Sequence, residues 1–493
     1  MTVSSTSRPS SADGNGAGAL VIGGGIAGLV TALDLARAGH RPVLLEAAER
    51  FGGGLSAHDV GGLTLDAGAE SFATARPAIA DLLAELGLAD RIVQPNPAGA
   101  WVRHRAGTAP LPAVGLLGIP GRWWAADVRR VIGIGGVARS AADAVLPVKA
   151  GVPAGTTLAA LVRTRMGRRI LDRLVEPVAG GVYAADPDQL DVRTVIPGLD
   201  SALRETGSLA AAVRGMRGGG ERSGSAVATV AGGLHTLVPA LLHAIRTAGG
   251  VLYTGTSVHS LRTGPDGWHV VLSNGSTLSA PAAVLAVPAP TATALIADAA
   301  PGVTTSMLQA PISPVLICTL VVDDHRLDAA PRGTGVLVSA LAHGVAAKAL
   351  THATAKWQWL AERAGTGRHV LRLSYGRGAD LPAEADLPRM ALADAGVLLG
   401  VPLNSSSVVD AAVVRWTSAL PAPRPGHTDA VSALRRAVEP LRLHIVGAPV
   451  AGSGLSGVVT DARNQAAALS DALGAVAMIA SPAATGPPAP TGG

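Results

Sequence analysis

The clearest pattern of apolar and polar positions lies near the N-terminus. Four apolar residues, Ala19–Ile22, predict a buried strand that runs directly into a glycine-rich turn, Gly23–Gly28. Apolar and small residues then recur at helical spacing until Gly39, which marks the end of a helix. A second apolar strand, Val43–Leu45, ends at Glu46. The pattern therefore predicts a strand–turn–helix–strand unit that closes on an acidic residue.

This unit carries the residues of a dinucleotide-binding site. Gly23 permits the tight turn, Gly25 lets the backbone approach a pyrophosphate, and Gly28 allows the helix and strand to pack closely. The first N–H groups of the helix would face the phosphates, and Glu46 would accept a hydrogen bond from an adenosine ribose hydroxyl. The other residues of the predicted turn are Gly24, Ile26 and Ala27. The unit favours nucleotide binding over an ordinary glycine-rich turn, but by itself it leaves FAD and NAD open.

A second strand and glycine-rich loop lie near the C-terminus. The apolar run Leu443–Val446 is followed by Gly447–Gly457 and by a helix that reaches about Leu473. We therefore expect the C-terminus to return to the nucleotide-binding part of the fold. A site built from both ends of the chain fits FAD better than NAD, whose site is usually built within one contiguous domain.

The segments between these ends predict a two-lobed α/β protein with an α+β substrate-binding part. Arg163–Arg173 is expected to form one basic helix. In Leu174–Pro187, Pro177 is expected to break a helix, and Gly181 and Tyr183 are expected to lie in a following turn that lines a pocket. The predicted parts are an N-terminal tail (1–18), three FAD-binding parts (19–86, 227–299 and 421–480), a helical part that faces substrate or membrane (87–215), a mixed-sheet substrate-binding part (300–420) and a C-terminal tail (481–493).

Composition narrows the choice further. Only 2% of the residues are aromatic, so the core must be built from Ala, Val and Leu. The single cysteine, Cys318, lies in an apolar strand pattern, which predicts a buried thiol in a reducing compartment. Residues 1–18 lack the apolar region of a signal peptide, and no run of 18 apolar residues predicts a membrane-spanning helix. We expect a cytoplasmic protein, and contact with the inner face of the membrane is left open.

The charge is unevenly distributed. Residues 86–215 contain 16 Lys and Arg against 10 Asp and Glu, whereas the net charge of the whole chain is +5. A basic segment of this kind suits an acidic ligand, an anionic membrane or a solvated helix face, and no nucleic-acid-binding motif accompanies it. None of the 13 histidines has the spacing of a metal site or a catalytic triad, so no metal is expected.

Taken together, the motifs resemble those of the protoporphyrinogen/coproporphyrinogen III oxidases, within the flavin amine oxidase and phytoene desaturase superfamily. The superfamily features are VIGGGIAGLVTALDL, Glu46, an ER-F-GG segment and the C-terminal glycine loop. Narrower features are LDAGAESF followed by Arg76, the segment Leu174–Leu199, and RWTSALPAPRPGH at 415–427. The chain is most similar in these motifs to the coproporphyrinogen III oxidases of Gram-positive bacteria. Departures occur at Ala448, at 421–423 and at Ala462.

The resemblance implies a two-lobed, amine-oxidase-like fold with a Rossmann-type FAD domain, a mixed-sheet domain and a helical domain. It implies FAD contacts beyond the first turn and Glu46 at Ala47, Gly54, Gly68, Ala69, Glu70, Ser71, Val258, Trp416, Ser453, Gly454 and Leu455. Arg76 falls where related bacterial enzymes have a basic residue near a substrate propionate, although a surface charge at the start of a helix would explain it equally well.

The implied activity is the FAD- and dioxygen-dependent oxidation of coproporphyrinogen III to coproporphyrin III in haem biosynthesis, with release of hydrogen peroxide. No side chain is assigned as an acid or base, because the flavin carries the redox chemistry. Three alternatives stay open: a protoporphyrinogen IX oxidase, another amine oxidase or carotenoid desaturase, and a non-catalytic flavin protein that docks on membranes. The expected partners are a porphyrinogen and dioxygen, without nucleic acid; transient contact with other haem-synthesis enzymes is left open.

Overall fold

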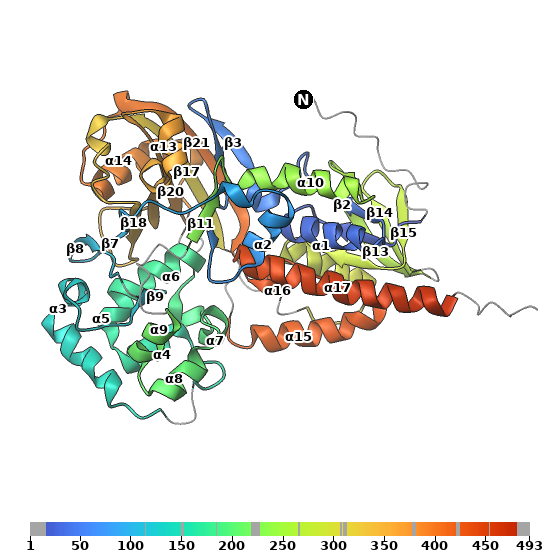
Figure 1. Cartoon of the computed structure of the whole chain (residues 1–493), viewed down its shortest axis with the longest axis horizontal. Helices are drawn as coiled ribbons and strands as arrows, with labels where there is room; N and C mark the ends of the chain where they lie inside the picture. The colour runs from blue at the N-terminus through green and yellow to red at the C-terminus, as the bar shows by residue number, and fades with distance from the viewer. Residues whose placement is uncertain are drawn as a thin grey trace, which may run out of the picture.

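A computed structural model describes residues 16–113, 115–148, 152–183, 185–217, 227–264, 267–305, 308, 313–376, 381–420, 424–452 and 454–480 (Figure 1). The predicted tails lie outside these ranges except for residues 16–18, and so do Ser453 and the departure at 421–423.

A five-stranded parallel sheet forms the first half of the molecule. Its strand order is β12 (Val251–Tyr253), β2 (Pro42–Leu45), β1 (Ala19–Ile22), β16 (Ala283–Leu285) and β22 (Leu443–Ile445), and every neighbouring pair is parallel. Strands β1, β2, β16 and β22 are buried along their whole length, which is why each consists almost entirely of apolar residues. Three segments that are far apart in the sequence therefore build one sheet.

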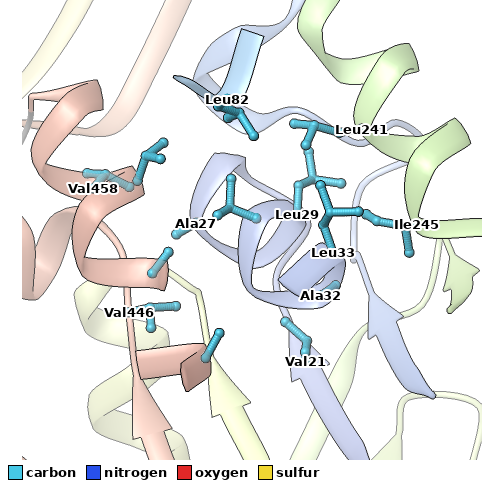
Figure 2. Packing of buried hydrophobic residues seen from close by; sticks show 14 of the residues in the cluster. Val21, Ala27, Leu29, Ala32, Leu33, Leu82, Leu241, Ile245, Val446 and Val458 are labelled. Atoms are coloured by element: carbon cyan, nitrogen blue, oxygen red, sulfur yellow. The ribbon is translucent and has the colours of Figure 1, made fainter. Parts of the chain in front are cut away.

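Helices cover one face of this sheet. Helix α1 (Ile26–Arg37) lies between α10 (Leu237–Thr247) and α17 (Leu455–Ala480), and α2 (Ala78–Glu85) packs against α17. Leu29 and Leu33 of α1 point toward Leu241 and Ile245 of α10, while Val458 of α17 lies on the other side of α1 (Figure 2). These side chains belong to one buried apolar cluster, which fixes the turn between β1 and α1 against the C-terminal helix.

The opposite face of the parallel sheet is also buried. Three antiparallel strands pack there, in the order β13 (Val258–Gly264), β14 (Gly267–Leu272) and β15 (Thr277–Ala280). Helices α11 (Ala289–Ala299) and α15 (His427–Val438) contribute side chains to the same apolar cluster. Trp268 is only 1% exposed there, and its indole N–H donates to the carbonyl of Leu441 at 2.8 Å.

A seven-stranded sheet forms the second lobe, which lies above helices α3–α9 in Figure 1. Its order is β21 (Val408–Leu420), β17 (Ser313–Asp323), β20 (Arg368–Tyr375), β19 (Ala349–His352), β18 (Gly335–Val338), β7 (Trp101–His104) and β8 (Gly107–Pro110). Only the β18–β7 pair is parallel, so the sheet is mixed as expected. Strands β7 and β8 come from the segment 87–215, which we expected to be helical, and that expectation was wrong for these residues.

Further elements cover both faces of the mixed sheet. Helix α14 (Leu387–Leu399) contributes to the apolar cluster on one face. The hairpin of β3 (Ala57–Val60) and β4 (Leu63–Asp66), with α12 (Ala353–Lys356) and α13 (Gln358–Ala364), contributes to the cluster on the other. Cys318 of β17 is fully buried, and burial raises the pKa of its thiol to about 12, so the prediction of a buried, unreactive cysteine is confirmed.

The helical lobe follows β10 (Ile119–Pro120), and its helices are short. They are α3 (Ala126–Ala141), α4 (Leu158–Arg165), α5 (Arg168–Ile170), a π-helical turn (Leu171–Val175), α6 (Glu176–Tyr183), α7 (Val192–Val195), α8 (Leu199–Thr206) and α9 (Leu209–Met216). Within the part of the chain that the structure describes, no helix is both long and apolar enough to cross a membrane.

The prediction of one basic helix over Arg163–Arg173 was wrong. Helix α4 ends before Gly167, whose φ of 91° is favourable only for glycine, and the next helical turn starts at Arg168. Arg165 is buried and pairs with Asp143 at 2.6 Å, while Arg173 donates to the carbonyl of Val131 at 2.7 Å. Arg165 and Arg173 therefore bind other residues of the helical lobe.

The predicted turn at Gly181 and Tyr183 was also wrong, because these residues form the end of helix α6. The helix continues without a break from Arg168 through the π-helical turn and past Pro177. Proline lacks an N–H and would crowd the carbonyl of Arg173 in a regular helix, whereas the wider π turn accommodates such an interruption.

Candidate functional site

The turn between β1 and α1 depends on two glycines that no other residue could replace. Gly23 has a φ of 105°, and a Cβ there would lie 2.3 Å from the carbonyl oxygen of Ala286. A Cβ on Gly28 would lie 1.9 Å from the carbonyl oxygen of Gly23. These close backbone approaches are the reason that the strand and helix can pack so tightly.

Gly25 has a different environment. Its φ of −72° and ψ of 177° suit any residue, and a Cβ there would meet nothing within 4 Å. Gly25 is also the residue before the first turn of α1, and no side chain caps this helix end. Open space therefore lies beside the start of a 12-residue helix, where backbone N–H groups attract an anion.

Glu46 closes the edge of this space. Its Oε2 accepts a hydrogen bond from the N–H of Gly24 at 2.6 Å, and its Oε1 accepts one from Ala48 at 2.8 Å. The carboxylate is thus held beside the glycine turn, as the sequence predicted from its position at the end of β2. Ala47 lies between Glu46 and Ala48 in the chain.

A second glycine segment, Gly52–Gly54, lies against the first turn. The N–H of Gly52 donates to the carbonyl of Gly24 at 2.9 Å, and a Cβ on Gly53 would lie 3.3 Å from the Cα of Gly25. A Cβ on Gly54 would meet nothing within 4 Å, as at Gly25. The two segments consequently form a cradle of backbone that side chains would fill.

Residues 66–71, which we call the strap, run past this cradle. The N–H of Ala69 donates to the carbonyl of Gly54 at 2.9 Å, and a Cβ on Gly68 would lie 2.3 Å from the same oxygen. Trp416 of β21 donates from its indole N–H to the carbonyl of Ala67 at 3.3 Å. The strap therefore lies against both the cradle and the mixed sheet.

The C-terminal glycine loop reaches the same place. Strand β22 leads through Gly447 into the short helix α16 (Ala448–Ala451) and then into α17. A Cβ on Gly447 would lie 3.4 Å from the Cβ of Ala27, and a Cβ on Gly454 would meet nothing within 4 Å. Leu455 begins α17, and Ser456 Oγ donates to the carbonyl of Ala73 at 3.1 Å. The two ends of the chain meet, as the sequence predicted.

Val258 and the predicted substrate-binding residues lie further out. Val258 begins β13 and is partly buried. Arg76 is exposed and follows the strap, whereas Tyr183 is partly buried in the helical lobe. Burial raises the pKa of Tyr183 and the Arg76 cation opposes that rise, so the two side chains are close enough to interact electrostatically. Gly181 serves packing, because a Cβ there would lie 2.7 Å from Leu337 Cδ2 of β18.

Sequence reasoning missed two cations at this site, Lys356 and Arg372. Lys356 Nζ lies 2.7 Å from Glu70 Oε1, and Arg372 lies 2.6 Å from Glu70 Oε2. Although burial opposes ionisation, these cations lower the pKa of Glu70 to about 2. The signal for Arg372 was present, because a single arginine interrupts the otherwise apolar core of strand β20. Among the described residues, no group of three or more His, Cys, Asp or Glu side chains is arranged to hold a metal.

Comparison with known proteins agrees with this geometry. The sequence pattern described as "Flavin containing amine oxidoreductase" matches residues 26–470. The chain belongs to the flavin containing amine oxidoreductase family. The flavin cofactor of this family is FAD, and the backbone cradle with Glu46 at its edge fits a dinucleotide.

Individual relatives of this flavin oxidoreductase span almost its whole length. It is similar to a coproporphyrinogen III oxidase of Mycobacterium tuberculosis, with 32% identity over 92% of this chain and 98% of the relative. It is also similar to a coproporphyrinogen III oxidase of Bacillus subtilis, with 25% identity over 92% and 97% of the two chains. A crystal structure described as "Putative protoporphyrinogen oxidase from Exiguobacterium sp. 255-15" shares the fold, with a TM-score of 0.80, 23% identity and coverage of 92% and 98%.

Proposed function

We propose that this flavin oxidoreductase oxidises coproporphyrinogen III to coproporphyrin III. The observation that carries the proposal is the cradle built from both ends of the chain, in a sequence that aligns over 92% of its length with coproporphyrinogen III oxidases. The oxidation removes six electrons, and three molecules of dioxygen would take them up as three molecules of hydrogen peroxide. Bound FAD supplies the two-electron acceptor for each of the three steps.

Each part of the cradle is assigned to a part of the cofactor in this proposal. Gly23–Gly28 and Gly54 would hold the pyrophosphate, because backbone N–H groups and open space meet there. Glu46 and Ala47 would hold the ribose next to the adenine, and Val258 would lie beside the adenine. The strap residues Gly68, Ala69 and Ser71 and the backbone of Glu70, with Trp416, would hold the flavin ring, and Ser453, Gly454 and Leu455 would hold the ribityl chain and its surroundings.

Arg76 and Tyr183 are the residues that we assign to the substrate. Coproporphyrinogen III is apolar in its body and carries carboxylates at its rim, so an exposed cation and a half-buried aromatic residue suit its edge. Arg76 is exposed and acts electrostatically on Tyr183, and we propose that its guanidinium binds a propionate. Gly181 is assigned an indirect role, because it allows the helix that carries Tyr183 to approach β18.

Anaerobic mixing with porphyrinogens tests the function. Coproporphyrinogen III should bleach the yellow flavin absorbance, and dioxygen should restore it with three molecules of hydrogen peroxide for each porphyrin formed. Faster bleaching by protoporphyrinogen IX would favour that substrate, and bleaching by neither would overturn the proposal. Such a failure would leave an amine oxidase, a desaturase or a non-catalytic flavin protein.

A matched pair of variants tests the assignment of Arg76. Arg76→Met should raise the KM for coproporphyrinogen III with a small change in kcat, since a rim contact affects binding more than chemistry. Arg246→Met on α10, which is also exposed, should change neither value. Equal KM values for both variants would contradict the role of Arg76.

We also propose a membrane contact, and we assign it to α3. Ile134 of α3 is 81% exposed and follows Gly133, where a φ of 71° kinks the helix. Arg129 and Arg130 line a surface hollow together with Ile134. Exposed apolar and basic side chains of this kind suit an anionic lipid surface. Ile134→Ser should reduce sedimentation with anionic liposomes, whereas Arg168→Gln should not; the reverse result would overturn this assignment.

A further inference from the structure

Glu70 lies where the strap meets the mixed sheet, and both of its carboxylate oxygens are occupied. Oε1 accepts a hydrogen bond from Lys356 Nζ at 2.7 Å, and Oε2 accepts one from Arg372 at 2.6 Å. A second N–H of Arg372 donates to the carbonyl of Gly68 at 2.8 Å. The Glu70 side chain is therefore engaged with the sheet and is not free to bind a cofactor.

The three side chains form a largely buried group with an excess of positive charge. The exposed fractions of the Glu70, Lys356 and Arg372 side chains are 17%, 16% and 9%. Lys356 Nζ also lies 4.8 Å from the ring centre of Trp357, which is 2% exposed. Two cations and one carboxylate leave a net charge of +1, and water screens such a charge poorly at low exposure.

Among the described residues, Glu70 is the only carboxylate that forms an ion pair with Lys356 or Arg372. Burial and the Arg372 cation both lower the pKa of His58, so this histidine stays neutral at neutral pH. The carboxylate of Asp66 is already engaged by the N–H groups of Leu234 and His235 at 3.0 and 2.8 Å. The Arg372 cation therefore lies directly against the strap carbonyl of Gly68.

We propose that Glu70, Lys356 and Arg372 are positioning residues that fix the strap to the mixed sheet and, through their net positive charge, raise the reduction potential of the bound flavin. The inference rests on the proposed place of the flavin ring against the strap. A nearby positive charge stabilises a flavin that has gained electrons and negative charge, and this effect is strong where water is excluded. The Glu70 side chain would then act through the two cations and would not touch FAD.

Two substitutions that break the same ion pair separate charge from structure. Glu70→Gln raises the net charge of the group to +2, whereas Lys356→Met lowers it to zero. The midpoint potential of the bound flavin, measured by equilibration with a reference dye, should therefore rise in Glu70→Gln and fall in Lys356→Met. Lys356→Arg keeps the charge and should retain a potential close to that of the unmodified protein.

Asp323→Asn provides the matched control. Asp323 forms an ion pair at 2.8 Å with Arg368, which lies in β20 as Arg372 does. The Asp323 side chain is 52% exposed, so its substitution should not change the midpoint potential. Shifts of Glu70→Gln and Lys356→Met in the same direction, or loss of flavin from both, would overturn the inference. The measurement needs no porphyrinogen, so opposite shifts in a protein that no porphyrinogen reduces would leave this inference standing while the proposed function failed.

Discussion

Glycines at two places in this molecule allow close approach for different reasons. At the turn after β1, Gly23 and Gly28 lie against backbone carbonyl oxygens, and Gly25 leaves open space for a ligand. In helix α6, Gly181 lies against the side chain of Leu337 and lets the helix approach a sheet. The comparison shows that a glycine can indicate a close approach of another group. The atoms around the glycine show whether that group is a ligand or another part of the protein.

The two places also differ in what fixes their local structure. The turn at 23–28 follows from a short pattern of strand, glycines and helix, which the chain determines within about twenty residues. Helix α6 contains two adjacent glycines and Pro177, all of which disfavour a helix. It forms because the π turn accommodates the proline and because the apolar cluster of the helical lobe holds Leu174, Val175 and Ala179.

The largest expected effect separates two glycines of the same turn. Gly28→Val places side-chain atoms on the carbonyl of Gly23 and should cost about 3 kcal/mol or more of the free energy of unfolding. Gly25→Val should leave the unfolding free energy of the apoprotein almost unchanged but should abolish flavin retention, because its side chain fills the cradle. Urea unfolding and the visible absorbance of the purified proteins check both results. A yellow Gly25→Val protein would contradict our placement of the pyrophosphate.

The next effect tests whether long-range contacts hold the helical lobe. Asp143 is fully buried, pairs with Arg165 and accepts hydrogen bonds from the N–H groups of Leu209 and Ala210 at 3.0 and 2.9 Å. Asp143→Ala leaves the Arg165 cation buried and should cost about 3 kcal/mol in urea unfolding. Arg168→Gln is the control, since the Arg168 side chain is 81% exposed, and its effect should stay within about 0.5 kcal/mol.

The strap gives a prediction about pH. The pKa of Glu70 is about 2 in the folded protein and 4.5 in its unperturbed state, so its ionisation stabilises the fold fully above pH 4.5. This contribution, about 3 kcal/mol, should be lost as the pH falls from 4.5 toward 2. Urea unfolding over this range should show a smaller decline for Glu70→Gln. Equal slopes for the two proteins would contradict the ion pairs at the strap.

The smallest expected effect concerns the glycines of α6. Gly181→Ala places a Cβ 2.7 Å from Leu337, and the cost should exceed the gain in helix propensity by about 1 kcal/mol. Gly180→Ala would place its Cβ 3.7 Å from Glu176 Oε1, an ordinary contact, and should be neutral or slightly stabilising. The double substitution Gly181→Ala, Leu337→Ala should show a coupling that Gly180→Ala lacks. Equal effects of the two single substitutions would remove the distinction between these glycines.

The sequence was sufficient for the parts of the site in which local pattern and backbone geometry coincide. Glu46 was predicted because it ends a strand beside the turn, and the return of the C-terminus was predicted because strand β22 is followed by its own glycine loop. Lys356 and Arg372 were missed because their partner, Glu70, lies about 300 residues earlier in the chain. The entry of β7 and β8 into the mixed sheet was missed for the same reason, since β7 pairs with β18, more than 200 residues later.

The position of β22 at the edge of the parallel sheet has a consequence during protein synthesis. This strand and the start of α17 are synthesised long after the first turn, yet the loop between them reaches the cradle. The turn between β1 and α1 is synthesised early, and the side of α1 that packs against α17 stays uncovered until α17 has been made. A nascent chain that stops after β21 would therefore be released without its cofactor and with apolar surface of α1 exposed, as a substrate for chaperones or proteases.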